Sequence, residues 1–265
     1  MLRMLRSIPD LLASLSARFA IMTLLLAAPL LPAQVTAKPG SAQNAYIRTN
    51  TFGFFFAYSN DSSHILMGYA ENRKLLNIGA TYGRRIWAGK VVNWQYHGEI
   101  MPVALESDPV ENIQETPTTP GPLIGGSYQT EPITHCVPST GTITIPLENN
   151  QTEIFQVTTT CTRRWSIGEG MMPVGFQWNF IPHHRIQPFL VGHGGYMYTT
   201  NAIPVEGAGN FNFAFDFGAG VEIFRGKKRS LRLDYRYHHI SNHDTANENP
   251  GIDNGLAEIT YCFGK

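Results

Sequence analysis

Apolar and polar side chains alternate with a period of two residues in several stretches of this chain. In Phe211–Ile223 the odd positions are apolar, including four phenylalanines, whereas the even positions are mostly small or polar. The same alternation occurs in Met172–Phe180 and Ala257–Phe263. Because successive side chains of a β-strand point to opposite faces, each stretch predicts a strand with one apolar and one polar face. The chain shows no long helical pattern and no internal repeat.

The first forty residues have the arrangement of an export signal. Three arginines precede the uncharged run Phe19–Leu31, and small residues follow it. A basic flank, a short apolar core and a small-residue cleavage site form a secretory signal peptide. The run is shorter than the roughly 20 residues that a spanning helix needs. We expect residues 1–37 to be a signal peptide, cleaved after Ala37 or, as a second choice, Ala33, and residues 38–265 to form the mature domain.

An exported chain of alternating strands favours an outer-membrane β-barrel. A soluble β-sandwich would show the same alternation, but its core is only about 10 Å thick and would crowd large aromatic side chains. Charged residues make up 15% of the chain and aromatic residues 11%, which suits an outer surface that meets lipid. The formal net charge is zero, so nothing indicates a nucleic-acid partner. We predict an all-β, antiparallel, eight-stranded transmembrane barrel.

The connections between the predicted strands alternate in length. The strands lie near residues 51–59, 73–87, 90–104, 171–182, 187–200, 209–224, 229–240 and 255–263. Residues His64–Met67 also resemble a strand, but bacterial single-chain barrels have even strand numbers, so we assign them to a loop. The short turns near residues 88, 184 and 226 are expected to face the periplasm and the longer loops to face outside.

The connection of residues 105–170 is far longer than an ordinary loop. It contains strand-like pieces at Thr142–Ile145 and Thr152–Thr158, and we expect a long extracellular insertion that is either a hairpin extension or a mobile lid. Cys136 and Cys161 lie in it and are candidates for a disulfide in an oxidising compartment. The cysteines form no CxxC pair, which argues against a metal site.

The strand that begins at Leu231 reads LRLDYRYHHISN and carries the candidate site. One face consists of Leu231, Leu233, Tyr235, Tyr237, His239 and Ser241, and the other of Arg232, Asp234, Arg236 and His238. Exposing an arginine to hydrocarbon costs about 2 to 4 kcal/mol near the midplane, so the first face is predicted to meet lipid. His239 and Ser241 then lie on the outer wall, at the outer-leaflet end of their strand. His239 is close enough to act as general base on Ser241, although an aromatic-girdle position is the alternative interpretation of this pair.

A catalytic histidine needs an acidic partner, and a serine esterase needs oxyanion donors. The nearby acidic residues are Asp244, Glu248, Asp253 and Glu258. Asp253 is favoured because it lies just before the next strand, adjacent to the end of the His239 strand. The Asn242 side chain or backbone N–H groups beyond Ser241 could bind the oxyanion.

The segment HHISNHDTANENPGID, residues 238–253, resembles the lipid A 3-O-deacylases of the PagL type, also called acyloxyacyl-hydrolase-like. Their signature is His-x-Ser-Asn at a strand end, followed by a loop with Asn, Pro and Gly and an acidic residue. The resemblance is tightest from about Gln187 to the C-terminus and weaker over Phe52–Ser107, and residues 108–170 lie outside it.

The resemblance implies a role for each matching residue. His239 is the base, Ser241 the nucleophile, Asn242 an oxyanion contributor and Asp253 the acidic partner. The family commonly has Glu in place of Asp253, which is one methylene shorter, and Glu258 is a fallback that alternation places toward the lumen. Four further histidines are interpreted as structural: His238, which lies on the polar face, and His183, His184 and His193, none of which has a second ligand at metal spacing.

The function that follows is a serine esterase that releases an ester-linked 3-hydroxyacyl chain from lipid A. It is expected in the outer membrane of a Gram-negative bacterium, with lipopolysaccharide as substrate and without a metal or cofactor. The first alternative is a non-catalytic barrel with a structural or adhesive role, which the long insertion favours. The second is an outer-membrane phospholipase, with or without calcium. The sequence leaves open whether two barrels pair as a homodimer.

Overall fold

The computed structural model describes residues 46–133, 136–147 and 151–265. The predicted signal peptide lies outside the described residues. No helix within these ranges is long and apolar enough to cross a membrane.

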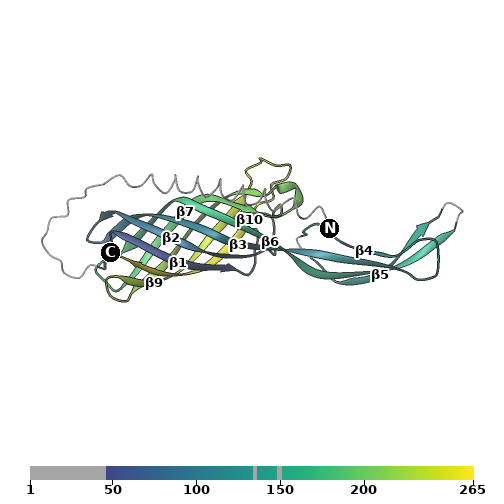
Figure 1. Cartoon of the computed structure of the whole chain (residues 1–265), viewed down its shortest axis with the longest axis horizontal. Helices are drawn as coiled ribbons and strands as arrows, with labels where there is room; N and C mark the ends of the chain where they lie inside the picture. Colours follow the sequence, from purple (N-terminus) through teal and green to yellow (C-terminus); the bar gives the residue numbers. More distant parts are fainter. Residues whose placement is uncertain (1–45, 134–135, 148–150) are drawn as a thin grey trace, which may run out of the picture. The chain divides into compact units, whose positions relative to one another are not determined.

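Eight antiparallel strands form a closed barrel (Figure 1). They are β1 (Asn50–Ser59), β2 (Lys74–Ala88), β3 (Val92–Pro117), β6 (Thr152–Phe180), β7 (Ile186–Thr199), β8 (Phe211–Phe224), β9 (Arg229–Ser241) and β10 (Ile252–Gly264). Each strand pairs with the next along this series, and β1 pairs with β10 to close the ring. The predicted eight-stranded antiparallel barrel is confirmed, and its strands lie within a few residues of the predicted ones except where β3 and β6 run longer.

The two ends of the barrel differ in their connections. Short turns join strands at one end, which we call the turn end; they comprise residues 89–91, 181–185 and 225–228. Longer connections lie at the other, the loop end; they comprise residues 60–73, 200–210 with a 3-10 turn η2 (Glu206–Ala208), and 242–251. Both described termini of the barrel chain, at the start of β1 and the end of β10, lie at the turn end.

Alternation along the strands separates an apolar outer wall from a polar lumen. On β8 and β9 the outward side chains are exposed, for example Phe217 at 51% and Tyr235 at 64%, whereas Asp216, Arg232 and Arg236 are buried inside. An outer wall of this kind is stable only against an apolar solvent such as lipid, because so many exposed aromatic side chains would be unfavourable in water.

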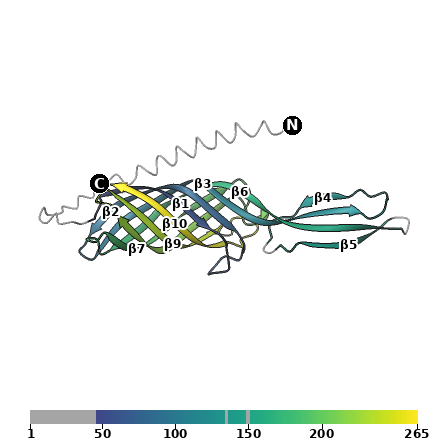
Figure 2. The ribbon, with the colours of Figure 1, turned by 90° about the horizontal axis from the view of Figure 1, so that it is seen from below.

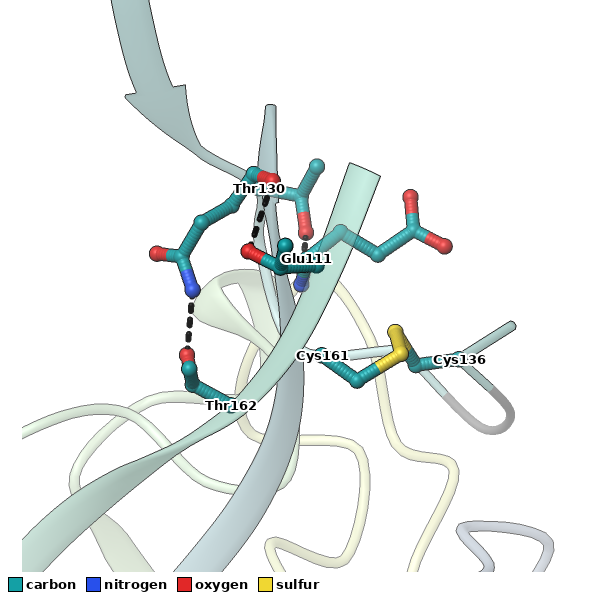
Figure 3. Close-up of a disulfide and its surroundings, with 7 residues drawn as sticks. Glu111, Thr130, Cys136, Cys161 and Thr162 are labelled. Atoms are coloured by element: carbon teal, nitrogen blue, oxygen red, sulfur yellow. Dashed lines mark hydrogen bonds between the residues drawn. A yellow bond between two sulfur atoms is a disulfide. The ribbon is translucent and has the colours of Figure 1, made fainter. Parts of the chain in front are cut away.

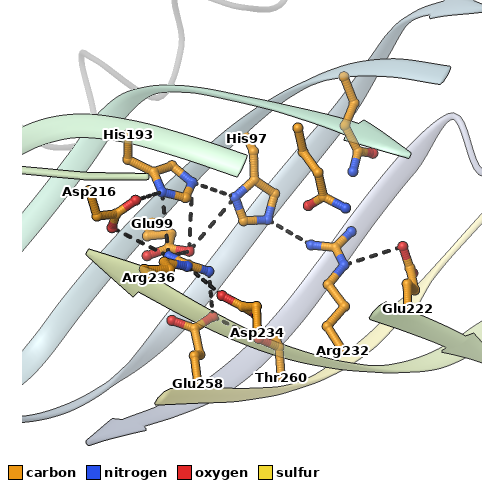
Figure 4. A network of polar contacts seen from close by, with 12 residues as sticks. His97, Glu99, His193, Asp216, Glu222, Arg232, Asp234, Arg236, Glu258 and Thr260 are labelled. Carbon is orange, nitrogen blue, oxygen red and sulfur yellow. Dashed lines mark hydrogen bonds and ion pairs between the residues drawn. The ribbon is translucent and has the colours of Figure 1, made fainter. Parts of the chain in front are cut away.

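Buried charged side chains fill the middle of the lumen (Figure 4). Arg236 lies at their centre, with its guanidinium nitrogens 2.9 Å from carboxylate oxygens of both Glu99 and Glu258. The carboxylates of Asp216 and Asp234 also contact it. These pairs join β3, β8, β9 and β10 across the barrel, so the lumen at this level is a packed core rather than a binding pocket.

Met172 departs from the prediction. We expected it on the outward face with Val174, but Met172 is 1% exposed whereas Val174 is 63% exposed. The register of β6 against β7 shifts between Met171 and Val174. A bulge of this kind adds an unpaired residue and turns the side chains before it to the other face, which strict alternation cannot anticipate.

The insertion of residues 105–170 is a β-sheet that continues the barrel wall (Figure 2). β3 and β6 run on past the predicted strand ends and stay paired as far as Pro117 and Phe155. Two further strands flank them, β4 (Gly126–Gln129) on β3 and β5 (Ser139–Pro146) on β6. We call this four-stranded part the extension. This strand pairing is that of a hairpin extension, the first of the two predicted alternatives.

A disulfide joins Cys136 to Cys161 in the extension (Figure 3), with the two Cα atoms 5.8 Å apart. It ties the segment before β5 to the long strand β6. Nearby, the Glu111 backbone N–H donates to the Thr130 hydroxyl over 3.0 Å. Cys262 is buried in the barrel and has no disulfide partner. The disulfide thus joins the two cysteines that the sequence offers as candidates.

Candidate active site

His239 and Ser241 lie two residues apart at the loop end of β9 and share its outward face. Their neighbours on β8 are Phe215, which pairs with His239, and Phe213, which pairs with Ser241. His239 is 6% exposed, and its ring lies 5.2 Å from that of Phe215. Ser241 is partly exposed. The structure thus places a shielded imidazole beside an accessible hydroxyl on the outer wall, as alternation predicts.

Asp253 faces His239 directly across the β9–β10 ladder. The His239 Nδ1 atom is 2.6 Å from the Asp253 Oδ1 atom, and Asp253 is fully buried. The aspartate is long enough for this contact because the two residues are opposite each other in register. The fallback residue Glu258 faces the lumen and accepts a hydrogen bond from Arg236 instead.

Three further groups hold the Asp253 carboxylate. The Tyr237 hydroxyl donates to Oδ1 over 2.7 Å, and the backbone N–H groups of Leu66 and Met67 donate to Oδ2 over 2.7 and 2.9 Å. We call residues 64–69 the roof loop. Hydrogen bonds to a carboxylate stabilise its ionised form, so these donors keep Asp253 an acceptor for His239.

The groups that hold the Asp253 carboxylate were not predicted from the sequence. Tyr237 shares the outward face with His239, two residues away, so alternation could have identified it. No signal could have identified the roof loop, because it contributes backbone groups, and its position depends on bridges of Ser62 to Asn254 and of Ala70 to Ile252.

The hydrogen bond to Asp253 determines which nitrogen of His239 can act as base. A carboxylate only accepts, so Nδ1 carries the proton and Nε2 has the free lone pair. This is the tautomer in which a histidine can remove a proton from a serine hydroxyl. Among the residues that the structure describes, the Ser241 hydroxyl makes no hydrogen bond.

Asn242 is a scaffold for the loop after Ser241. Its side-chain amide donates to the backbone carbonyls of Ala208 and Glu248, over 2.7 and 2.6 Å, and its Oδ1 accepts from the Asp244 N–H. Both amide hydrogens are therefore used within the protein. The backbone N–H groups of Asn242, Asp244 and Thr245 are engaged as well, with Asn249 Oδ1, Asn242 Oδ1 and the Asn242 carbonyl. Of the described backbone donors in residues 242–245, the His243 N–H is the one that makes no hydrogen bond and could bind an oxyanion.

Three residues in the lumen, His97, Glu99 and His193, have potential metal-ligand atoms within 4.8 Å of one another. Sequence spacing could not show this, since β3 and β7 bring the two histidines together. Arg232 lies 2.7 Å from His97 Nε2 and can only donate, so the His97 proton is on Nδ1, directed at His193 Nε2, 2.7 Å away. His193 Nδ1 then donates to Asp216 (Figure 4). Hydrogen bonds thus occupy the lone pairs that a metal would need.

Comparison with known families gives a match in the C-terminal part of the chain. The family model of lipid A 3-O-deacylase (PagL) matches residues 137–261. The predicted resemblance to the PagL family is confirmed. The match includes His239, Ser241, Asn242 and Asp253. It also includes residues 137–170, which we expected to lie outside the resemblance.

Solved structures resemble the chain only weakly. The outer membrane enzyme PagL is 11% identical with a TM-score of 0.45, over 80% of this chain and 99% of that chain. Neisserial surface protein A is 12% identical with a TM-score of 0.38, over 82% and 97%. OprG from Pseudomonas aeruginosa is 10% identical with a TM-score of 0.38, over 85% and 100%. A comparison with curated protein sequences gives no match.

The PagL family match and the apolar outer wall together place the barrel in the outer membrane of a Gram-negative bacterium. Short turns of such barrels face the periplasm. The loop end, with His239 and Ser241, then lies at the level of the outer leaflet.

Proposed function

We propose that this protein is a lipid A deacylase that works as a serine esterase, with Ser241 as nucleophile, His239 as base and Asp253 as the acidic partner. The observation that carries the proposal is the 2.6 Å contact of His239 Nδ1 with Asp253 on the outer wall, next to Ser241. The PagL family match supports lipid A as substrate.

Acylation would begin with attack of the Ser241 Oγ atom on the ester carbonyl carbon. His239 Nε2 takes the hydroxyl proton, and the resulting imidazolium is stabilised by the Asp253 carboxylate. The His243 backbone N–H, which makes no hydrogen bond among the described residues, would stabilise the oxyanion. The tetrahedral intermediate collapses, the sugar oxygen leaves with the proton from His239, and the acyl chain remains on Ser241.

Deacylation repeats these steps with water. His239 Nε2 removes a proton from the water molecule, the hydroxide attacks the acyl carbonyl, and Ser241 leaves with the proton from His239. The products are a free 3-hydroxy fatty acid and lipid A with one more free hydroxyl. All three catalytic groups come from one chain, so this mechanism needs no second copy.

The position of the site explains why the substrate would be a membrane lipid. Ser241 lies on the wall that meets hydrocarbon, flanked by Phe213, which is 45% exposed. A soluble ester has no access to such a site, whereas lipid A presents its acyl esters just below the sugar. The acyl chain can remain in apolar surroundings throughout the reaction.

Mass spectrometry of lipid A from cells that express the protein tests this proposal. Wild type should release one 3-hydroxyacyl chain, whereas Ser241→Ala and Asp253→Asn should lower the rate by about 10³-fold or more. Ser127→Ala, an exposed serine of β4, is the matched control and should retain activity.

Heat-modifiable migration in gels confirms that each variant is folded. Unchanged lipid A with folded wild type would overturn the proposal, as would full activity of Ser241→Ala. Fatty acid release from phospholipid, with lipid A intact, would instead indicate a phospholipase.

A further inference from the structure

A pocket lies on the outer wall at the turn end, the opposite end from Ser241. Its volume is about 350 Å³, and its lining includes Ile223, Leu231 and Tyr261 with three arginines, Arg185, Arg225 and Arg229. The three apolar residues form one row across neighbouring strands, since Ile223 pairs with Leu231 and Leu231 pairs with Tyr261. The pocket therefore has an apolar wall that continues the lipid-facing surface of β8, β9 and β10.

Three arginines lie at the edge of this wall. Arg185, Arg225 and Arg229 are exposed, and within the described ranges none of them forms an ion pair with an Asp or Glu side chain. The Arg185 Nε–H donates to the Phe224 carbonyl over 2.9 Å, which fixes this side chain beside the pocket. Glu222 lies only three residues before Arg225 in the sequence, but its side chain is buried and forms an ion pair with Arg48.

The combination of an apolar wall and unpaired guanidinium groups matches the chemistry of a phospholipid. Guanidinium forms bidentate, charge-assisted hydrogen bonds with phosphate oxygens. The turn end faces the periplasm, so the arginines lie at the headgroup level of the inner leaflet, whose lipids are glycerophospholipids. An acyl chain could extend from there along Ile223 and Leu231 toward the membrane centre.

We propose that this pocket binds one anionic glycerophospholipid of the periplasmic leaflet, with the phosphate between Arg185, Arg225 and Arg229 and an acyl chain on the row of Ile223, Leu231 and Tyr261. The site is separate from the proposed catalytic centre and does not depend on it. A bound lipid would neutralise the arginines and fix the rotation of the barrel wall relative to the headgroups.

Native mass spectrometry of the detergent-solubilised full chain tests the proposal with defined lipids. Wild type should retain one phosphatidylglycerol per barrel and should retain it in preference to phosphatidylcholine. Arg225→Ala/Arg229→Ala should lower this occupancy about tenfold or more, because two of the three guanidinium groups that would bind the phosphate are lost. Lys227→Ala/Lys228→Ala removes the same charge from the same turn, outside the pocket lining, and should bind like wild type.

A third variant separates a pocket from general electrostatic attraction. Leu231→Trp keeps all arginines but fills the apolar part, so it should also lose the retained lipid. Inorganic phosphate at millimolar concentration should not displace the lipid, because it cannot use the apolar wall. Equal losses in the two double variants, equal retention of both lipids, displacement by phosphate, or full binding by Leu231→Trp would each overturn the proposal. Heat-modifiable migration verifies that every variant is folded.

Discussion

Asp253 is the most constrained residue of the candidate site. Each of its carboxylate oxygens accepts two of the hydrogen bonds described above, from Tyr237 and His239 on one side and from the roof loop on the other. A carboxylate held in this way cannot rotate, so it fixes the ring plane and the tautomer of His239. The shorter side chain of aspartate is thus compensated by register and by the roof loop.

Tyr237→Phe tests this positioning role. The variant removes one donor to Asp253 and leaves the three catalytic groups in place, so kcat/KM on lipid A should fall about tenfold, the value of a hydrogen bond to a charged group. Tyr235→Phe changes the next outward tyrosine of β9 and should have no effect. If both variants retained full deacylation rates, Tyr237 would have no part in positioning Asp253.

At the scale of elements, the roof loop depends on a glycine. A Cβ atom at Gly68 would lie 2.6 Å from the Asp253 backbone nitrogen and 2.8 Å from the Ile252 carbonyl carbon. Only glycine permits this close approach of the loop to β10. The position of the roof loop against the Asp253 carboxylate therefore requires glycine at residue 68.

Gly68→Ala should displace the roof loop and weaken its two hydrogen bonds to Asp253. We expect a loss of deacylation of about 10- to 100-fold, because small displacements of catalytic groups are costly. The unfolding temperature should change little, since the barrel ladder is unaffected. Gly126→Ala has open space around the new Cβ atom and is the control. A large fall in stability with unchanged activity per folded molecule would contradict this role.

Alternation predicted the barrel strands and the two faces of β9 because lipid outside and buried charge inside impose opposite demands on neighbouring residues. Alternation was less informative where a strand has water on both of its faces. In the extension, where both faces of β5 and much of β6 meet water, it predicted only the pieces Thr142–Ile145 and Thr152–Thr158 and not the full strands. His239, Ser241 and Asp253 were predicted from alternation and resemblance together, whereas the roof loop depends on tertiary contacts that a sequence pattern does not contain.

For the whole molecule, the packed lumen is expected to supply rigidity, and the outer wall carries the proposed catalytic residues. The charged side chains around Arg236 join four strands on the lumen side of the wall that carries Ser241. Removal of one partner from a buried ion network leaves other charges uncompensated, which costs about 3 to 5 kcal/mol.

Arg236→Met should therefore destabilise the barrel by an amount in that range, measured as a shift of the urea midpoint of folding in lipid vesicles. Lys227→Met, which removes an exposed charge in a turn, should leave the midpoint unchanged. A midpoint for Arg236→Met equal to that of wild type would show that the network contributes no net stability.

We propose that Ser241, activated by His239 and Asp253, is a nucleophile on the lipid-facing wall. A sulfonyl fluoride with a long alkyl chain, added to the protein in vesicles, tests it directly, because the reagent partitions into lipid and modifies activated serines. Peptide mass spectrometry should locate one adduct, on Ser241. Labelling should be abolished in His239→Ala, slowed in Asp253→Asn and unchanged in His184→Ala. Labelling of another residue, or equal rates in wild type and His239→Ala, would contradict the account.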